Sequence, residues 1–230
     1  MLDGHIHLHY GVFHPDERIR RDSEELFKML GNFGVERVAG VFLPDNKDVV
    51  NEFDRVYPGV YVRSFEVEEI RNENFEFLKV HEGFLPFTDE VLVEVLETGT
   101  KNGFEKFQFH TNPGQEHLLK TFTEYVDRED VKIYLVHGAR ELLLNEEIIS
   151  YEGNIFFGTS TSRAMILPDD KEKLLKNYET LPDMIVFESD FGLSNLNWNG
   201  DYWYRIVLDD IGSLGFDGKI FKKNLKKFLR

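Results

Sequence analysis

Apolar and polar positions follow two alternating patterns along the whole chain. Short apolar stretches rich in β-branched and aromatic residues are each followed by a longer stretch with the spacing of an amphipathic helix. We therefore predict a regular succession of strands and helices. The short stretches predict eight strands: Leu2–Leu8, Arg37–Leu43, Val60–Val67, Phe75–His81, Phe104–His110, Lys132–His137, Asn154–Thr159 and Met184–Asp190.

Amphipathic stretches predict helices between these strands, and only the crossover at Glu68–Asn74 is too short for a full helix. Strands that alternate with helices pair in parallel, and eight such units in about 250 residues are typical of a (β/α)8 barrel. A doubly wound open sheet is the alternative. No linker interrupts the pattern, so we expect one domain over residues 1–230. The predicted helices are Asp22–Asn32, Asn46–Tyr57, Asp89–Asn102, Gly114–Arg128, Glu141–Tyr151, Asp169–Tyr178 and Tyr202–Leu214, with a final helix, Lys219–Arg230, against the barrel bottom or the first strand.

Composition excludes several classes of protein. The 42 acidic residues outnumber the 27 basic ones and give a formal charge of -15, which argues against binding to nucleic acid or to an anionic membrane. The absence of cysteine excludes disulfides, thiolate metal sites and cysteine nucleophiles. No segment approaches the roughly 20 apolar residues that span a bilayer, and the start does not resemble a signal peptide. We therefore expect a cytoplasmic protein without a membrane partner.

Polar residues recur at the carboxyl ends of the predicted strands, the end that carries the active site in a (β/α)8 barrel. His5 and His7 lie two positions apart in the first strand, so both imidazoles project to one face, which we predict to be the barrel interior. Polar residues are costly in an apolar strand unless they have partners, so this recurrence favours one shared site. The other members are Lys79 and His81 in the fourth strand, His110 in the fifth, His137 in the sixth and Asp190 in the eighth.

The chemistry of this set favours a metal ion. Imidazole nitrogens with a carboxylate and no sulfur suit zinc, manganese, iron or nickel and leave an open position for water. Such an ion lowers the pKa of its bound water towards ~7 and polarises a carbonyl oxygen. Asp190 is the natural carboxylate ligand, and it can also accept a proton from that water. An isolated His-x-His pair is more often an ordinary surface or core pair, so the prediction depends on the whole set.

Five motifs follow one another along the chain: Asp3-Gly4-His5-Ile6-His7, Leu78-Lys79-Val80-His81-Glu82-Gly83-Phe84, Phe109-His110-Thr111-Asn112, Val136-His137-Gly138 and Ser189-Asp190. In this order they resemble the motifs of the amidohydrolase superfamily, and most closely its amidohydrolase-related branch, the amidohydrolase 2 type of TIM-barrel metal-dependent hydrolase. The terminal helix also resembles that branch, so the resemblance spans essentially the whole chain.

The resemblance implies a divalent metal ion, with zinc the leading candidate, held by His5, His7, His110 and Asp190. His137 would orient the substrate, help to hold the metal or act as an acid. Lys79, His81 and Glu82 are candidates for a second ion or for the substrate. Because the Lys-x-His arrangement resembles the single-ion branch, we expect one ion and leave a second open.

The resemblance further implies a hydrolase that uses a metal-activated water to cleave a C–N or C–O bond of a small molecule, such as an amide, ester or lactone. Asp190 and His137 would be its catalytic residues. Arg140 and Arg163 follow the sixth and seventh strands, where they could bind a substrate carboxylate or phosphate, although internal salt bridges explain them equally well. His9 either lines the mouth of the site or, as is more common for a loop histidine, lies in solvent.

Other functions stay open at this point. Some superfamily members decarboxylate aromatic or unsaturated acids with the same ligands. PHP-type phosphoesterases and TatD-type nucleases also begin with His-x-His, but the first usually close with an Asp-x-His that is absent here, and the second carry a fourth-strand glutamate motif that Lys79-Val80-His81-Glu82 does not reproduce. Glu188-Ser189-Asp190 does resemble the Glu-Thr-Asp of TatD-type enzymes. A non-catalytic metal-binding barrel is the remaining alternative.

Overall fold

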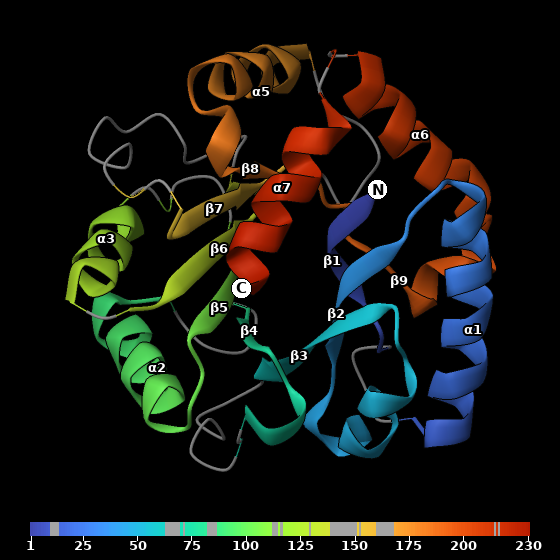
Figure 1. Ribbon diagram of the computed structural model, residues 1–230, viewed down its shortest axis with the longest axis horizontal. Coiled ribbons are helices and arrows are strands. Elements are labelled where there is room, and N and C mark those ends of the chain that lie inside the picture. The colour runs from blue at the N-terminus through green and yellow to red at the C-terminus, as the bar shows by residue number, and fades with distance from the viewer. Residues whose placement is uncertain are drawn as a thin grey trace.

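Nine parallel strands form one curved sheet in the computed structural model (Figure 1). The structure describes residues 1–9, 14–62, 70, 72–81, 87–111, 115, 117–128, 130–138, 151, 153–159, 168–213, 215 and 217–230. The strand order is β8-β7-β6-β5-β4-β3-β2-β1-β9, which follows the chain except at β9. The strands are β1 (Leu2–His7), β2 (Arg37–Phe42), β3 (Val56–Val62), β4 (Phe77–Val80), β5 (Lys106–His110), β6 (Lys132–Val136), β7 (Ile155–Gly158), β8 (Ile185–Val186) and β9 (Phe191–Gly192).

The sheet closes into a barrel through the segment that contains β8 and β9. β8 pairs with β7 at one edge of the sheet, and β9 pairs with β1 at the other. Between them the Gly4 N–H donates to the Phe187 oxygen (2.8 Å), and the Asp190 N–H donates to the His5 oxygen (3.1 Å). The predicted eighth strand is thus two short strands in one extended segment. The predicted (β/α)8 barrel is confirmed.

Helices surround the barrel (Figure 1). Of the predicted helices, Glu141–Tyr151 lies outside the described residues except for its last position. In the part of the chain that the structure describes, no helix is long and apolar enough to cross a membrane. The helices are α1 (Asp16–Asn32), α2 (Asp89–Lys101), α3 (Leu118–Arg128), α5 (Pro168–Thr180), α6 (Gly200–Ser213) and α7 (Gly218–Leu229), with short 3-10 helices at Pro44–Glu52, Asn72–Asn74, Pro182–Met184 and Leu193–Trp198.

The third strand begins earlier than predicted. β3 starts before the predicted Val60, and the predicted helix Asn46–Tyr57 is instead a 3-10 helix over Pro44–Glu52. Pro58 and Gly59 concealed the strand in the sequence, because both residue types usually weaken one. Gly59 is needed where β3 packs on β4, since a Cβ there would lie 2.0 Å from an aromatic ring of β4.

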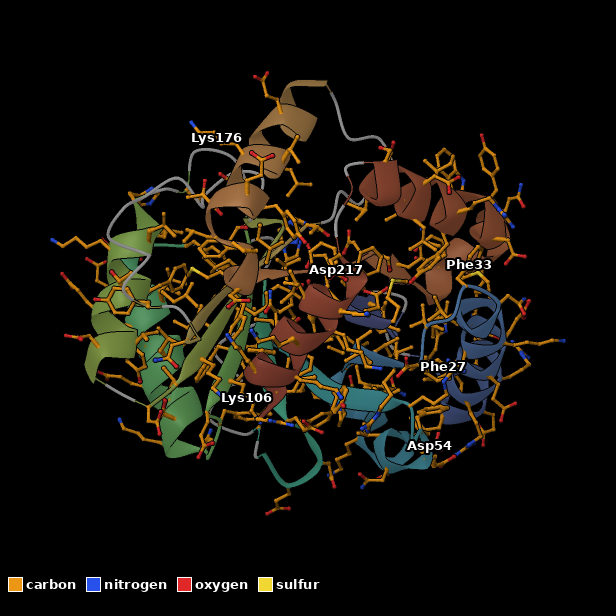
Figure 2. The ribbon with its side chains drawn as sticks, turned by 45° about the horizontal axis from the view of Figure 1, so that its top comes forward. Phe27, Phe33, Asp54, Lys106, Lys176 and Asp217 are labelled. Atoms are coloured by element: carbon orange, nitrogen blue, oxygen red, sulfur yellow. The ribbon has the colours of Figure 1, made fainter. Side chains whose placement is uncertain are left out.

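The terminal helix α7 closes the N-terminal end of the barrel. Asp217, labelled in Figure 2, caps it by accepting a hydrogen bond from the Lys219 N–H (2.8 Å). The fully buried Phe228 packs inside the strands, with ring centroids 5.5 Å from Tyr134 and 5.7 Å from Phe156. The prediction that this helix packs against the barrel bottom is confirmed. The polar residues therefore belong to the opposite, C-terminal end.

Candidate metal centre

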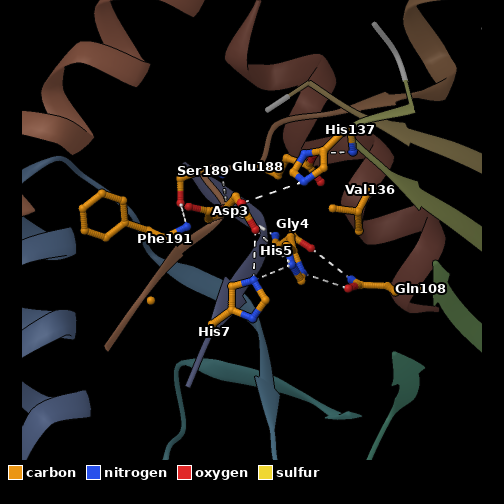
Figure 3. A network of polar contacts seen from close by, with 12 residues as sticks. Asp3, Gly4, His5, His7, Gln108, Val136, His137, Glu188, Ser189 and Phe191 are labelled. Carbon is orange, nitrogen blue, oxygen red and sulfur yellow. Dashed lines mark hydrogen bonds and ion pairs between the residues drawn. The ribbon is translucent and has the colours of Figure 1, made fainter. Parts of the chain in front are cut away.

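A β-bulge in β1 determines which of its side chains face the barrel interior. From Asp3 to Ile6 the strand advances three residues while its partner β2 advances two. The extra residue lets Asp3 point away from the centre while His5 and His7 point into it (Figure 3). Gly4 also faces inward, where a Cβ would lie 2.5 Å from a β8 side chain, so only glycine fits.

Asp3 ties together the two segments that carry the predicted ligands. Its Oδ1 accepts hydrogen bonds from the Ser189 N–H (3.0 Å) and the His5 N–H (3.3 Å), and its Oδ2 accepts one from the Tyr204 hydroxyl (3.0 Å). Burial raises the pKa of Asp3 to about 7, although these hydrogen bonds act in the opposite direction. The carboxyl group thus holds the β1 bulge beside the residue that precedes Asp190.

His5, His7 and Asp190 bring three ligand atoms together. The Nε2 atoms of His5 and His7 lie 3.2 Å apart, and Asp190 Oδ1 lies 3.0 Å from His7 Nε2 and 3.4 Å from His5 Nε2. Among the residues that the structure describes, these three form the group with metal-ligand geometry. We call them the ligand trio.

The partner of His5 fixes its protonation state. The Gln108 amide nitrogen donates to the Gly4 oxygen (3.0 Å), which can only accept, so the Gln108 oxygen must face His5 Nδ1 (3.0 Å). His5 therefore carries its proton on Nδ1, and its Nε2 lone pair points into the trio. Burial, followed by the charge of Lys79, holds the pKa of His5 well below its usual value, so the ring is neutral.

His9 extends the trio by one more imidazole. Its side chain is only 7% exposed, which corrects our expectation that a loop histidine here more often lies in solvent. His9 Nε2 lies 3.1 Å from His7 Nδ1, and the His9 ring packs 5.0 Å from the Tyr61 ring. When His7 carries its proton on Nδ1 and donates a hydrogen bond to His9, its Nε2 has a lone pair that faces Asp190. The Nε2 atom of His5 has the same arrangement.

The donor set of the trio fits a divalent metal ion. Burial opposes the charge of Asp190, but contacts with His5 and His7 and the charge of His137 keep its pKa well below the usual value. The Nε2 atoms of His5 and His7 and a carboxylate oxygen thus converge, and when both nitrogens carry lone pairs the three atoms repel one another unless a cation lies between them. Around a tetrahedral ion with bonds of ~2.0 Å, ligand atoms lie ~3.3 Å apart. The separations of 3.0, 3.2 and 3.4 Å match that value.

Lys79, His81 and His110 add polar groups from β4 and β5. Lys79 is fully buried, its ammonium forms no hydrogen bond with the described residues, and burial lowers its pKa to about 7. The rings of His81 and His110 stack with centroids 4.0 Å apart. Burial, followed by the charge of Lys79, lowers the pKa of His81 to about 4 and that of His110 further. His110 does not belong to the trio, so its role as a metal ligand stays a prediction.

Gln108 and Glu188 are site residues that sequence reasoning missed. Gln108 orients His5, and Glu188 binds His137. Each stands two positions before a predicted site residue in an extended segment and therefore faces the same way, so strand parity was the signal that could have found them. Burial alone would lower the pKa of His137, but the hydrogen bond and the charge of Glu188 outweigh it and raise that pKa.

Several predicted residues lie elsewhere or outside the described chain. Glu82, Arg140 and Arg163 are outside the described residues. His117 is exposed on the turn before α3. Trp203, an aromatic residue on α6, is 40% exposed.

Comparisons with known proteins support the fold. The structure of amidohydrolase 2 from Bifidobacterium longum subsp. infantis matches with a TM-score of 0.60 over 98% of both chains, at 14% sequence identity. No family model matches the chain, and a search of curated proteins also gives no match. At this identity the likeness concerns the fold alone. The predicted resemblance is confirmed at that level: the chain has the TIM-barrel fold of amidohydrolase 2.

Proposed function

We propose that this protein is a metal-dependent hydrolase that cleaves a C–N or C–O bond, such as an amide, ester or lactone, in a small molecule. The observation that carries the proposal is the convergence of two imidazole nitrogens and one carboxylate oxygen at the C-terminal end of the barrel. The formal charge of -15 supports a small molecule over nucleic acid as the substrate.

A single divalent ion, with zinc the first candidate, would be held by His5, His7 and Asp190. His110 is proposed as a further ligand on the strength of the motif resemblance. When bound, such an ion activates water and polarises a carbonyl oxygen. A second ion, or the substrate, would be met by Lys79, His81 and Glu82, and Arg140 and Arg163 are proposed for a substrate carboxylate or phosphate.

Proton transfer is the task we assign to Asp190 and His137. Asp190 Oδ1 belongs to the trio, which leaves Oδ2 to accept a proton from the attacking water. Oδ2 lies 3.8 Å from His137 Nε2, so the two groups flank the same space. The low pKa of Asp190 keeps its carboxylate ionised, so that Oδ2 can accept a proton, and the raised pKa of His137 favours transfer of that proton through its imidazole to the leaving group.

The test is a panel of amides, esters and lactones assayed with zinc-supplemented wild-type protein and with Asp190→Asn. We expect hydrolysis by the wild type and a loss of about 10³-fold in the variant, which keeps the shape of the side chain. His117→Ala is the matched control, because this histidine is exposed and is not part of the trio. Activity retained by Asp190→Asn would refute the role of Asp190, and release of carbon dioxide from aromatic acids without hydrolysis would favour a decarboxylase.

A further inference from the structure

Glu188 is a fully buried carboxylate with a donor at each oxygen. Its Oε1 accepts from the backbone N–H of His137 (2.7 Å) and lies 3.0 Å from His137 Nδ1, while its Oε2 accepts from the buried Tyr134 hydroxyl. A buried charge is strongly unfavourable unless it is paired and hydrogen-bonded. These three contacts meet that requirement, and His137 supplies two of the three donor groups.

The neighbouring strand β7 leaves room for this carboxylate. A Cβ at Gly158 would lie 2.0 Å from Oε2 and 2.2 Å from Oε1 of Glu188, so a larger residue would displace it. The following residue, Thr159, accepts from the Glu188 N–H through its hydroxyl (3.3 Å). Residues of β6, β7 and the segment after β8 together determine the position of the Glu188 carboxylate.

The backbone of His137 adopts a conformation that a side chain disfavours. Its φ is 66°, in the left-handed region that non-glycine residues seldom occupy. The N–H bond to Glu188 holds this turn, and the turn places the imidazole against the same carboxylate. Because a carboxylate oxygen only accepts, Nδ1 must carry a proton, and Nε2 lies 3.8 Å from Asp190 Oδ2.

We propose that Glu188 is a positioning residue that fixes both the orientation and the tautomer of His137, with Nδ1–H bound to Glu188 and Nε2 facing Asp190. The consequence for turnover rests on the proposed function. As the water oxygen bonds to the carbonyl carbon, its proton passes to Asp190 Oδ2. Asp190 passes this proton to the bare Nε2 of His137, which gives it to the leaving nitrogen or oxygen as that bond breaks, while Nδ1–H stays on Glu188.

The tautomer can be measured without a substrate, by long-range ¹H–¹⁵N correlation NMR on zinc-loaded protein labelled at histidine nitrogens. In the wild type we expect a protonated, hydrogen-bonded Nδ1 on His137. In Glu188→Gln we expect its Nδ1 proton to exchange with solvent about 10- to 100-fold faster, because a charge-assisted hydrogen bond is lost. Gly158→Ala should act in the same way, since it displaces the carboxylate without changing its chemistry.

Tyr134→Phe is the control, because it removes the donor to Oε2 and leaves both bonds from His137 to Oε1. We expect it to change the His137 signals far less than Glu188→Gln does. A wild-type spectrum with Nε2 protonated and Nδ1 bare would overturn the proposal, even if neither variant folds, and so would His137 signals that are unchanged in Glu188→Gln. If the tautomer is as expected and no substrate is hydrolysed, the positioning role stands and the proposed function fails.

Discussion

The two halves of the barrel interior are stabilised in different ways, although the same strands form both. At the N-terminal end Phe77, Tyr134 and Phe156 meet Phe228 of α7, and ring packing excludes water. At the C-terminal end the interior holds buried polar and charged side chains, namely His5, Lys79, Gln108, His137 and Glu188, together with Asp190, whose side chain is 8% exposed. Burial of apolar rings stabilises the first half. In the second half, almost every buried polar atom needs a hydrogen-bond partner.

The difference shows how a stable barrel can carry a reactive end. The stability of an apolar layer depends on how well its side chains fill the space, so the stabilising free energy is spread over many contacts. A polar layer depends on individual hydrogen bonds, such as that between Gln108 and His5, and each bond also fixes where a proton lies. We therefore expect substitutions in the first half to change stability and those in the second to change metal binding.

Phe228→Ala should have the largest effect on folding. The change leaves a cavity between α7 and the strands, and we expect the free energy of unfolding to fall by about 3–5 kcal/mol, measured by urea denaturation. Binding of zinc by the remaining folded protein should be unchanged, because the trio lies at the other end. A loss of zinc binding in folded Phe228→Ala would contradict the division into two halves.

Lys79→Met should remove a pH dependence of stability. The pKa of Lys79 is lowered from 10.5 to about 7 in the folded chain, so between these values the unfolded chain binds more protons and stability rises with pH. Relative to Lys79→Met, we expect the wild type to gain on the order of a few kcal/mol between pH 7 and 10. Parallel curves for the two proteins would show that Lys79 is charged, and therefore paired, in the fold.

His9→Ala should weaken metal binding without unfolding the protein. The variant removes the ring that faces His7 Nδ1, and loss of such a supporting group typically lowers metal affinity by about 10- to 100-fold. Competition titration with a chelating dye measures the change. The exposed His117→Ala is the control and should bind as the wild type does, whereas equal affinity of all three proteins would remove His9 from the site.

Lys223→Ala should have the smallest effect. The ion pair between Lys223 and Asp183 lies on the outer face of α7, with the lysine side chain 58% exposed and an N–O distance of 3.3 Å. Exposed pairs of this kind contribute about 0–1 kcal/mol. Thermal unfolding should therefore hardly differ from that of the wild type, and a clear shift would mean that α7 is held by charge as well as by Phe228.

The sequence predicted the apolar half of the barrel interior more fully than the polar half. Hydrophobic period and strand parity predicted the strands and directed His5 and His7 inward, because those signals are local. The same parity could have identified Gln108 and Glu188. The bulge at Gly4 could not be predicted, since it depends on side chains from β6 and β8 that lie far away in the chain.

The burial of His9 and the backbone of His137 were also beyond local reasoning. A histidine two residues past a strand end is usually solvated, whereas His9 is buried against the ring of Tyr61 from β3, a residue far away in the sequence. The left-handed turn at His137 is hydrogen-bonded to Glu188, a residue of the segment between β8 and β9 that closes the barrel. Proton positions in this half follow from such distant partners, which a pattern of residue types does not contain.

The central claim is that the trio of His5, His7 and Asp190 holds a divalent metal ion, and its stoichiometry is the most direct test. Wild-type protein and Asp190→Asn are incubated with zinc, freed of unbound metal, and analysed by inductively coupled plasma mass spectrometry. We predict about one equivalent of zinc per wild-type chain and a sharp loss in the variant. Less than about a tenth of an equivalent in the folded wild type, with zinc, manganese, iron and nickel each tested, would contradict the claim.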